Sequence, residues 1–452
     1  MIQKFIYIIF FAVLFTACDD EVDVPSPQSG DTDFSVFVSL GDSYTAGYTD
    51  GALSAEGQSS AFASLMAGQM ADFLESKYTI PYLPGGTSVS SSLEGKMALQ
   101  VTVSGLSPVT TEGNPELLTD PSTWINGDAP YHNLGIPGAR SFHLISPEYG
   151  DPSQGEGNFN PFYARFATAP GTSTALSDAV GQDPTFFSLW IGGNDVLGYA
   201  LAGGEGEVGG TENSDITPET VFTQSYNSIL SQLTGTDADG VIATIPDIDM
   251  LPFFNTILPD DLELTADQAD ALNEGYTEYN AAAAQYGIDE ISFSDGNNYF
   301  VIEDASHDLN MRQIEADEKL LLSLPREKIT AEGWGTSEPI PEEYVLDEDE
   351  LSNISGATNA FNDVIRNGAS EFDLALIELD ELLYETAEGL VVDGNTYSNT
   401  YITGGLFSLD GIHTNGRGSA IIANEFIDAI NAHYGSFIPH VLVNDQDGLV
   451  LP

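Results

Sequence analysis

The sequence predicts an α/β protein built on a doubly wound parallel sheet, and three observations lead to that class. Short apolar runs with the length of buried strands recur along the 452-residue chain, and helical patterns fall between them. Strands that alternate with helices are typical of a parallel sheet covered by helices. The hydrophobic fraction of 42% is ample for a packed core of this kind.

Five segments are the predicted strands. Four are clear apolar runs, Phe34–Leu40, Phe186–Ile191, Val241–Ile245 and Leu374–Ile377, and a weaker one, Tyr131–Ile136, comes second in chain order. The runs are continuous rather than alternating, which indicates strands buried on both faces. In such a sheet, functional residues gather beyond the carboxyl ends of the strands.

Helical spacing of apolar residues appears in four segments that follow or precede these strands. They are Ala61–Leu74, Phe222–Leu233, Thr358–Gly368 and Ser419–Tyr434. The last segment keeps its apolar residues on one face, which favours packing against the core.

Two further stretches are longer than ordinary loops. Residues 79–129 carry Ser, Thr, Gly and Pro with short β-like pieces, and residues 252–351 are longer still and heavily acidic. We expect both to be insertions with structure of their own inside one domain over residues 34–437. A C-terminal tail over residues 438–452 completes the chain.

The net charge of the chain is unusually negative. Eleven Lys and Arg stand against 70 Asp and Glu, a net charge of −59. Such a surface repels phosphates, so nucleic acid is excluded as a partner. Two acidic turns, Thr236–Gly240 and Asn444–Gly448, lack the closing Glu of an EF-hand and are interpreted as turns.

The N-terminus has the features of an export signal. Lys4 precedes an apolar run, Phe5–Ala17, that is too short to span a bilayer and ends in small residues before Cys18. This pattern resembles a bacterial lipoprotein signal over residues 1–17, with Cys18 as the lipidated first residue of the mature protein. The acidic, Pro- and Ser-containing segment 18–33 then reads as a tether. The resemblance implies an exported lipoprotein anchored in the cell envelope, and the acidic residues behind Cys18 resemble a cue for surface display.

The chemistry begins in "FVSLGDSYTAG", where the apolar run of the first predicted strand ends abruptly in Gly-Asp-Ser, and Ser43 is the serine of that motif. A serine hydroxyl is a poor nucleophile unless a base removes its proton and donors stabilise the oxyanion. The best base is His413, in a glycine-rich loop before the last helix, with Asp410 three residues earlier to orient it. The other histidines are interpreted as structural: His132, His143, His307, His433 and His440.

Two further strand ends offer oxyanion donors. "NLGIPGAR" places Gly138 after the second strand, and "LWIGGNDV" places Asn194 after the third. Gly138 offers a backbone N–H, and the Asn194 side chain offers an amide. Each alone is an ordinary turn residue. No His and Cys cluster indicates zinc, and the hydrolysis that these residues suggest requires no cofactor.

Together these four blocks resemble the SGNH hydrolases of the GDSL esterase/lipase family, in which Ser, Gly, Asn and His occur in this order. The resemblance implies the SGNH-hydrolase (flavodoxin-like) three-layer fold, with a parallel five-stranded sheet and, in this chain, large insertions. It also implies a catalytic triad of Ser43, Asp410 and His413 and an oxyanion hole of Ser43, Gly138 and Asn194. The motif departs from the family name at Tyr44, where Leu is usual.

The function implied is hydrolysis of carboxylic esters, on a small-molecule or lipid substrate, through an acyl-enzyme. Two alternatives remain open at this level. The same residues would serve a carbohydrate O-acetylesterase acting on exported glycans. The chain could also be a non-catalytic surface protein that uses its insertions to bind a partner.

Overall fold

The computed structural model describes residues 26–102 and 105–452. The expected signal sequence over residues 1–17, the expected lipidation site at Cys18 and the first part of the expected tether lie outside these residues. Gln28 is described and exchanges two backbone hydrogen bonds with Phe437, so the chain enters the domain beside the end of its last helix.

The core of the molecule is a sheet of five parallel strands, which confirms the predicted fold class. The strands are β1 (Phe37–Gly41), β7 (Asn133–Gly135), β8 (Phe186–Trp190), β9 (Asp239–Ala243) and β16 (Ala375–Ile377). They lie in the order β16-β9-β8-β1-β7. The chain therefore reverses its direction of travel across the sheet between β1 and β8, and such a switch point is where open α/β sheets bind ligands.

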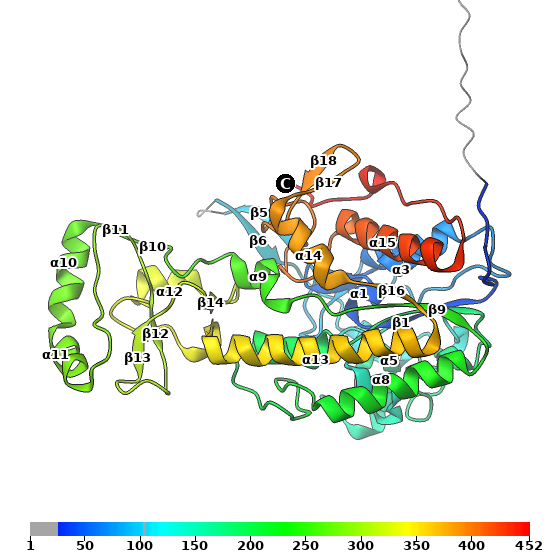
Figure 1. The fold of residues 1–452 in the computed structure, drawn as a ribbon, viewed down its shortest axis with the longest axis horizontal. Coiled ribbons are helices and arrows are strands. Elements are labelled where there is room, and N and C mark those ends of the chain that lie inside the picture. The colour runs from blue at the N-terminus through cyan, green and yellow to red at the C-terminus, as the bar shows by residue number, and fades with distance from the viewer. Residues whose placement is uncertain (1–25, 103–104) are drawn as a thin grey trace, which may run out of the picture.

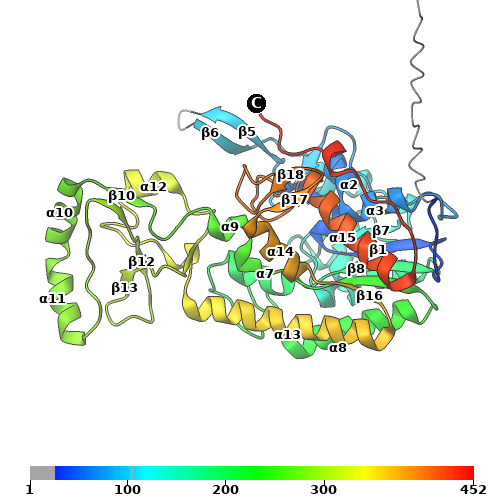
Figure 2. The ribbon, with the colours of Figure 1, turned by 45° about the horizontal axis from the view of Figure 1, so that its top comes forward.

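Helices cover both faces of this sheet (Figures 1 and 2). One face is covered by α3 (Phe62–Gln69) and α15 (Gly416–Tyr434), and the other by α6 (Ala175–Val180), α8 (Glu219–Thr234) and α13 (Glu348–Phe372). Aromatic rings join the layers: Phe62 stacks on Phe426 at 4.6 Å between α3 and α15. On the opposite face, Phe222 stacks on Phe361 at 4.1 Å between α8 and α13.

A lobe with its own hydrophobic core extends to one side of the sheet domain (Figure 1). Its elements are β10 (Leu262–Leu264), α10 (Ala266–Gly275), α11 (Thr277–Tyr286), β11 (Gly296–Asn298), β12 (Val301–Glu303), β13 (Met311–Gln313), β14 (Lys319–Leu320), α12 (Arg326–Ala331) and β15 (Val345–Leu346). Arg312 ties the lobe together through ion pairs of 2.6 Å to both Asp304 and Glu318. The helix α13 runs from the lobe along the sheet domain (Figure 2).

The segment between β1 and β7 forms a smaller annex. It contains β2 (Tyr48–Thr49), β3 (Ala52–Ser54), α2 (Ala55–Ser60), β4 (Ser88–Val89), α4 (Glu116–Thr119) and the hairpin of β5 (Met97–Thr102) and β6 (Gly105–Thr110). Leu53, Val89 and Phe162 bury a small core there. After α15, Ile438 and Val443 pack into the main core. No helix within residues 26–102 and 105–452 combines the length and apolar character needed to cross a bilayer.

Candidate active site

Ser43 lies at the switch point, where β1 passes directly into the short helix α1 (Ser43–Ala46). The preceding Gly41 permits this turn, because a Cβ there would lie 2.1 Å from Thr45 Oγ1 and 2.4 Å from the Trp190 carbonyl oxygen. Asp42 caps the helix by accepting the Tyr44 N–H at 3.0 Å. The tight strand-to-helix turn thus sets Ser43 at the sheet edge, with 7% of the residue exposed.

His413 comes to Ser43 from the far end of the chain. Its Nε2 lies 2.8 Å from Ser43 Oγ, and its Nδ1 lies 2.9 Å from Asp410 Oδ2. His413 and Asp410 both lie in the loop before α15. The N-cap of that helix, Asn415, accepts the N–H groups of Arg417 and Gly418. The structure therefore brings Ser43, His413 and Asp410 together in one hydrogen-bonded chain.

The carboxylate of Asp410 is held from several sides. Oδ1 accepts the N–H groups of Ile412 and His413 and the hydroxyl of Ser408, and Oδ2 accepts the Gly51 N–H. Burial raises the pKa of Asp410, but the interaction with His413 and these hydrogen bonds outweigh it and lower the pKa to about 2. Asp410 is therefore a carboxylate across the neutral range.

Aromatic rings enclose the imidazole of His413. The ring of Tyr44 lies 5.2 Å from it and the ring of Tyr48 lies 5.0 Å from it, centroid to centroid. The hydroxyl of Tyr44 donates to the Ile412 carbonyl at 2.7 Å, which fastens the first ring to the histidine loop. These rings restrict the imidazole to the orientation in which it meets Ser43.

Asp42 is a second buried carboxyl beside the serine. Burial raises its pKa to about 7, although the Tyr44 N–H and His413 act in the opposite direction. The raised pKa means that the folded site disfavours the ionised, negatively charged form of Asp42.

Gly138 and Asn194 follow the two strands that flank β1. Gly138 has φ +78°, and a Cβ there would meet nothing within 4 Å, so its backbone faces open space. Asn194 begins the helix α7 (Asn194–Leu201), and its side-chain amide donates to the Ala139 carbonyl at 2.9 Å. This bond uses one of the two amide hydrogens and leaves the other for a ligand. The Ile136 N–H donates to the Gly41 carbonyl at 3.0 Å, which holds the Gly138 loop against the Ser43 turn.

The sequence reasoning missed the residue that locks these two loops together. Asp195 is fully buried and accepts both the backbone N–H and the hydroxyl of Ser141, each at 2.8 Å. It thereby joins the loop of Gly138 to the helix that begins at Asn194. Its position directly after Asn194 was the available signal. The Gly51 N–H that binds Asp410 and the Ala139 carbonyl that binds Asn194 had no such signal, because backbone groups leave no pattern in a sequence.

The remaining histidines lie elsewhere. His143 stacks on Tyr149 at 3.9 Å, and burial together with Arg140 lowers its pKa to about 3. His132 pairs with Thr79, and His440 with Asp428. In the part of the chain that the structure describes, no group of three or more His, Cys, Asp or Glu could hold a metal ion.

A serine hydroxyl, an imidazole and a carboxylate in this order can pass the hydroxyl proton to the imidazole. Nearby N–H groups can stabilise an oxyanion. The arrangement, on a parallel sheet at its switch point, is typical of hydrolases with a serine nucleophile.

Comparison with known families agrees with that class. The family model of the GDSL-like lipase/acylhydrolases matches residues 37–426. The chain therefore belongs to this family of ester hydrolases. A search of curated proteins found no match to the chain.

Solved structures that resemble the chain include three hydrolases. An α/β hydrolase from the metagenome of Lake Arreo is 12% identical, with 88% of this chain and 96% of that chain covered and a TM-score of 0.34. An acetylxylan esterase from Geobacillus stearothermophilus is 10% identical, with 88% and 95% covered and a TM-score of 0.33. A phospholipase A1 from Streptomyces albidoflavus is 12% identical, with 88% and 98% covered and a TM-score of 0.31.

Proposed function

We propose that this ester hydrolase works through a catalytic triad of Ser43, His413 and Asp410. The observation that carries the proposal is the hydrogen-bonded chain from Ser43 Oγ to His413 Nε2 and from His413 Nδ1 to Asp410. In this arrangement His413 accepts the Ser43 proton while Asp410 fixes the tautomer and stabilises the imidazolium that forms. The low pKa of Asp410 keeps it ionised for that task.

The reaction then runs in two halves. Ser43 Oγ attacks the ester carbonyl, and His413 returns the proton to the departing alcohol as the acyl-enzyme forms. Water, deprotonated by His413, attacks the acyl-enzyme, and His413 returns that proton to Ser43 Oγ as the carboxylic acid is released. We place the oxyanion of each tetrahedral intermediate against the N–H groups of Ser43 and Gly138 and the amide of Asn194. The substrate is a carboxylic ester of a small molecule or a lipid.

The test is hydrolysis of p-nitrophenyl acetate by the wild type and by Ser43→Ala. The variant should lose turnover while keeping the same thermal unfolding midpoint, and only the wild type should bind a serine-reactive phosphonate at one equivalent. Ser59→Ala is the matched control, because Ser59 is exposed on α2 and its hydroxyl only meets the Ala55 carbonyl and the Tyr82 hydroxyl. Full activity in Ser43→Ala would contradict the proposal.

We also propose that the protein is exported and anchored in the cell envelope by a lipid on Cys18. The support is the residue pattern before Cys18 and the tether-like composition after it. Expression of the full chain with Cys18→Ser tests the anchor. The wild type should partition with membranes and carry an acyl mass at Cys18, and the variant should be found in the aqueous fraction; equal partitioning of the two would contradict it.

A further inference from the structure

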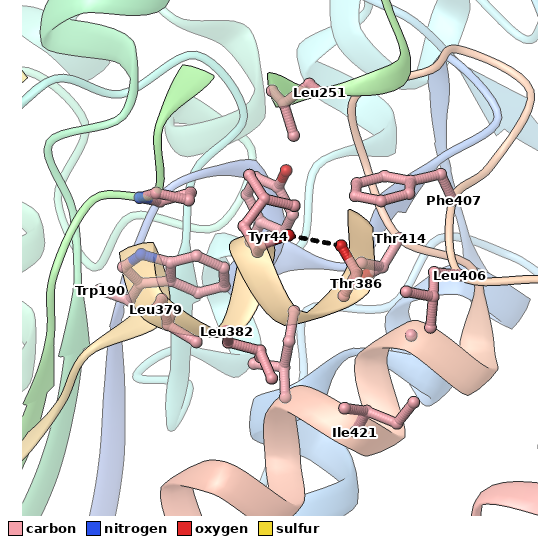
Figure 3. A pocket seen from close by; sticks show the side chains of 14 residues that line it. Tyr44, Trp190, Leu251, Leu379, Leu382, Thr386, Leu406, Phe407, Thr414 and Ile421 are labelled. Carbon is pink, nitrogen blue, oxygen red and sulfur yellow. Dashed lines mark hydrogen bonds between the residues drawn. The ribbon is translucent and has the colours of Figure 1, made fainter. Parts of the chain in front are cut away.

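An apolar cavity of about 60 Å³ lies directly behind Tyr44. It opens between α15 and the helix α14 (Leu379–Glu388), at the carboxyl ends of β8 and β9. Figure 3 shows how its walls are built. The lining includes Leu251, Leu382, Phe407 and Ile421, with Trp190 beside Tyr44.

The cavity wall carries no charged side chain, and its polar side-chain groups are three hydroxyls and the indole N–H of Trp190. Three lining residues carry a hydroxyl, namely Tyr44, Thr386 and Thr414. The hydroxyl of Tyr44 donates to the Ile412 carbonyl, that of Thr386 donates to the Leu383 carbonyl at 2.7 Å, and that of Thr414 pairs with Ser419 at 2.9 Å. A polar ligand would lose its hydrogen bonds there, so the cavity suits a hydrocarbon chain.

Tyr44 stands between this cavity and the catalytic residues. Its ring packs on Trp190, which lines the cavity, at 4.6 Å and on His413, which does not, at 5.2 Å between ring centroids. Ser43 and His413 do not line the cavity, although their chain neighbours Tyr44 and Thr414 do. The ring therefore closes a hydrocarbon-binding space off from the serine that would carry the acyl group.

We propose that Tyr44 sets the acyl-chain length of the substrate by keeping this cavity closed to the acyl group on Ser43. The inference rests on the proposed function and names its substrate class: the wild type hydrolyses esters of short acids, acetyl in preference to octanoyl. Removing the ring opens the cavity to the acyl chain. The volume has room for about four to six water-sized groups, which is enough for the far end of an octanoyl chain.

The expected effect follows from burial. Each methylene that leaves water for an apolar site is worth about fourfold in binding. Several methylenes entering the cavity should therefore change the selectivity by well over tenfold.

The first experiment measures kcat/KM for p-nitrophenyl acetate and octanoate with the full chain. Tyr44→Ala and Tyr44→Leu should raise the octanoate-to-acetate ratio at least tenfold over the wild type. Tyr44→Phe keeps the ring and should keep the wild-type ratio. A wild type that prefers octanoate, or an unchanged ratio in both opened variants with native circular dichroism, would overturn the inference.

A second substitution tests whether the gain comes from the cavity itself. Leu382 is half-buried on α14, and Leu382→Trp should fill the space and cancel the gain when added to Tyr44→Ala. Glu381→Trp adds the same side chain at the neighbouring, exposed position and should leave the gain intact. Equal effects of the two tryptophans would overturn the role of the cavity.

A binding measurement separates this inference from the proposed function. Titration of hexanoate by calorimetry into Ser43→Ala should give at least tenfold weaker binding than into Ser43→Ala combined with Tyr44→Ala. This readout needs no turnover. If no ester is hydrolysed by the wild type or by any variant, the proposed function fails, and the hexanoate titration still decides whether Tyr44 closes the cavity.

Discussion

The backbone N–H of Phe253 donates a hydrogen bond of 2.9 Å to the carbonyl of Gly411, inside the loop that carries Asp410 and His413. Phe253 lies on the short helix α9 (Pro252–Asn255), and its own carbonyl accepts the N–H of Leu322 from the lobe at 2.9 Å. The lobe is thus joined to the histidine loop through two consecutive backbone bonds. The position of the lobe can therefore affect where the loop holds Asp410 and His413.

Gly411→Ala should disturb this joint. Gly411 has φ +73°, and a Cβ there would lie 3.1 Å from both Phe253 N and Leu322 Cδ2. The left-handed backbone should cost about 1–2 kcal/mol of unfolding free energy, and the contact should displace Asp410 and lower kcat. Gly435→Ala is the control, because Gly435 has φ +64° with nothing within 4 Å. Urea unfolding should show similar losses for both variants, and kcat should fall only for Gly411→Ala.

Asp410→Asn should lower kcat by about 10⁴, because an amide cannot hold the imidazole in the required tautomer. Asp50→Asn provides a matched comparison, from the turn between β2 and β3 that contacts the same loop. Asp50 accepts the Leu409 N–H at 3.0 Å, a bond that an asparagine oxygen can keep. The loss in kcat of Asp50→Asn should stay below about tenfold, since Asp50 does not act on the imidazole. Equal losses in the two variants would mean that Asp410 only supports the loop.

Asn194→Ala should lower kcat by about 10²–10³ with little change in KM, because its amide would serve the oxyanion rather than the bound ester. The variant also loses the bond to the Ala139 carbonyl. Asn194→Asp likewise offers no amide hydrogen to either partner and adds a negative charge where the oxyanion would form, so it should be slower still. A kcat equal to that of the wild type in Asn194→Ala would remove Asn194 from the oxyanion hole.

Asp42→Asn should change how stability depends on pH. The folded pKa of Asp42, about 7, lies above its ordinary value of 3.8, so the folded state holds this proton more tightly. The stabilisation that the proton on Asp42 gives the folded state is complete below pH 3.8 and is lost as the pH rises towards 7. Asparagine can still cap α1 but never ionises. At pH 8 the free energy of unfolding of the variant should exceed that of the wild type by on the order of 2 kcal/mol, and near pH 4 this difference should disappear. Chemical unfolding across this range measures it; parallel profiles would contradict the assignment.

The strands of the central sheet could be predicted because they are continuous apolar runs. The structure places them within a few residues of the predicted bounds, and α8 and α15 likewise begin and end close to the predicted helices. The helix predicted at Thr358–Gly368 is part of the longer α13. The start of α13 has its own sequence signal, a capping box in which Asp347 and Glu350 each accept the other's backbone N–H.

The lobe shows where sequence reasoning reaches its limit. Its strands have two or three residues each, too few to show a period. Its core forms between residues that are distant in sequence, such as Ile257 and Leu320. The candidate triad could be predicted because its chemistry requires particular side chains, and its catalytic role stays a prediction. The wall formed by Tyr44 could not, since an aromatic residue after Ser43 gives no sign of which side chains it separates.

The position of the lobe within the chain also has a consequence for folding kinetics. β9 and β16 pair in register, Val241 with Ala375, yet the whole lobe and α13 lie between them in sequence. Closing a loop of that length is slow, because its entropy must be lost before the pairing is gained. If the lobe collapses early around its own core, the effective loop shortens to the segments that lead in and out of it. The last strand of the sheet should therefore join late, and amide protection in β16 should appear after protection in the lobe.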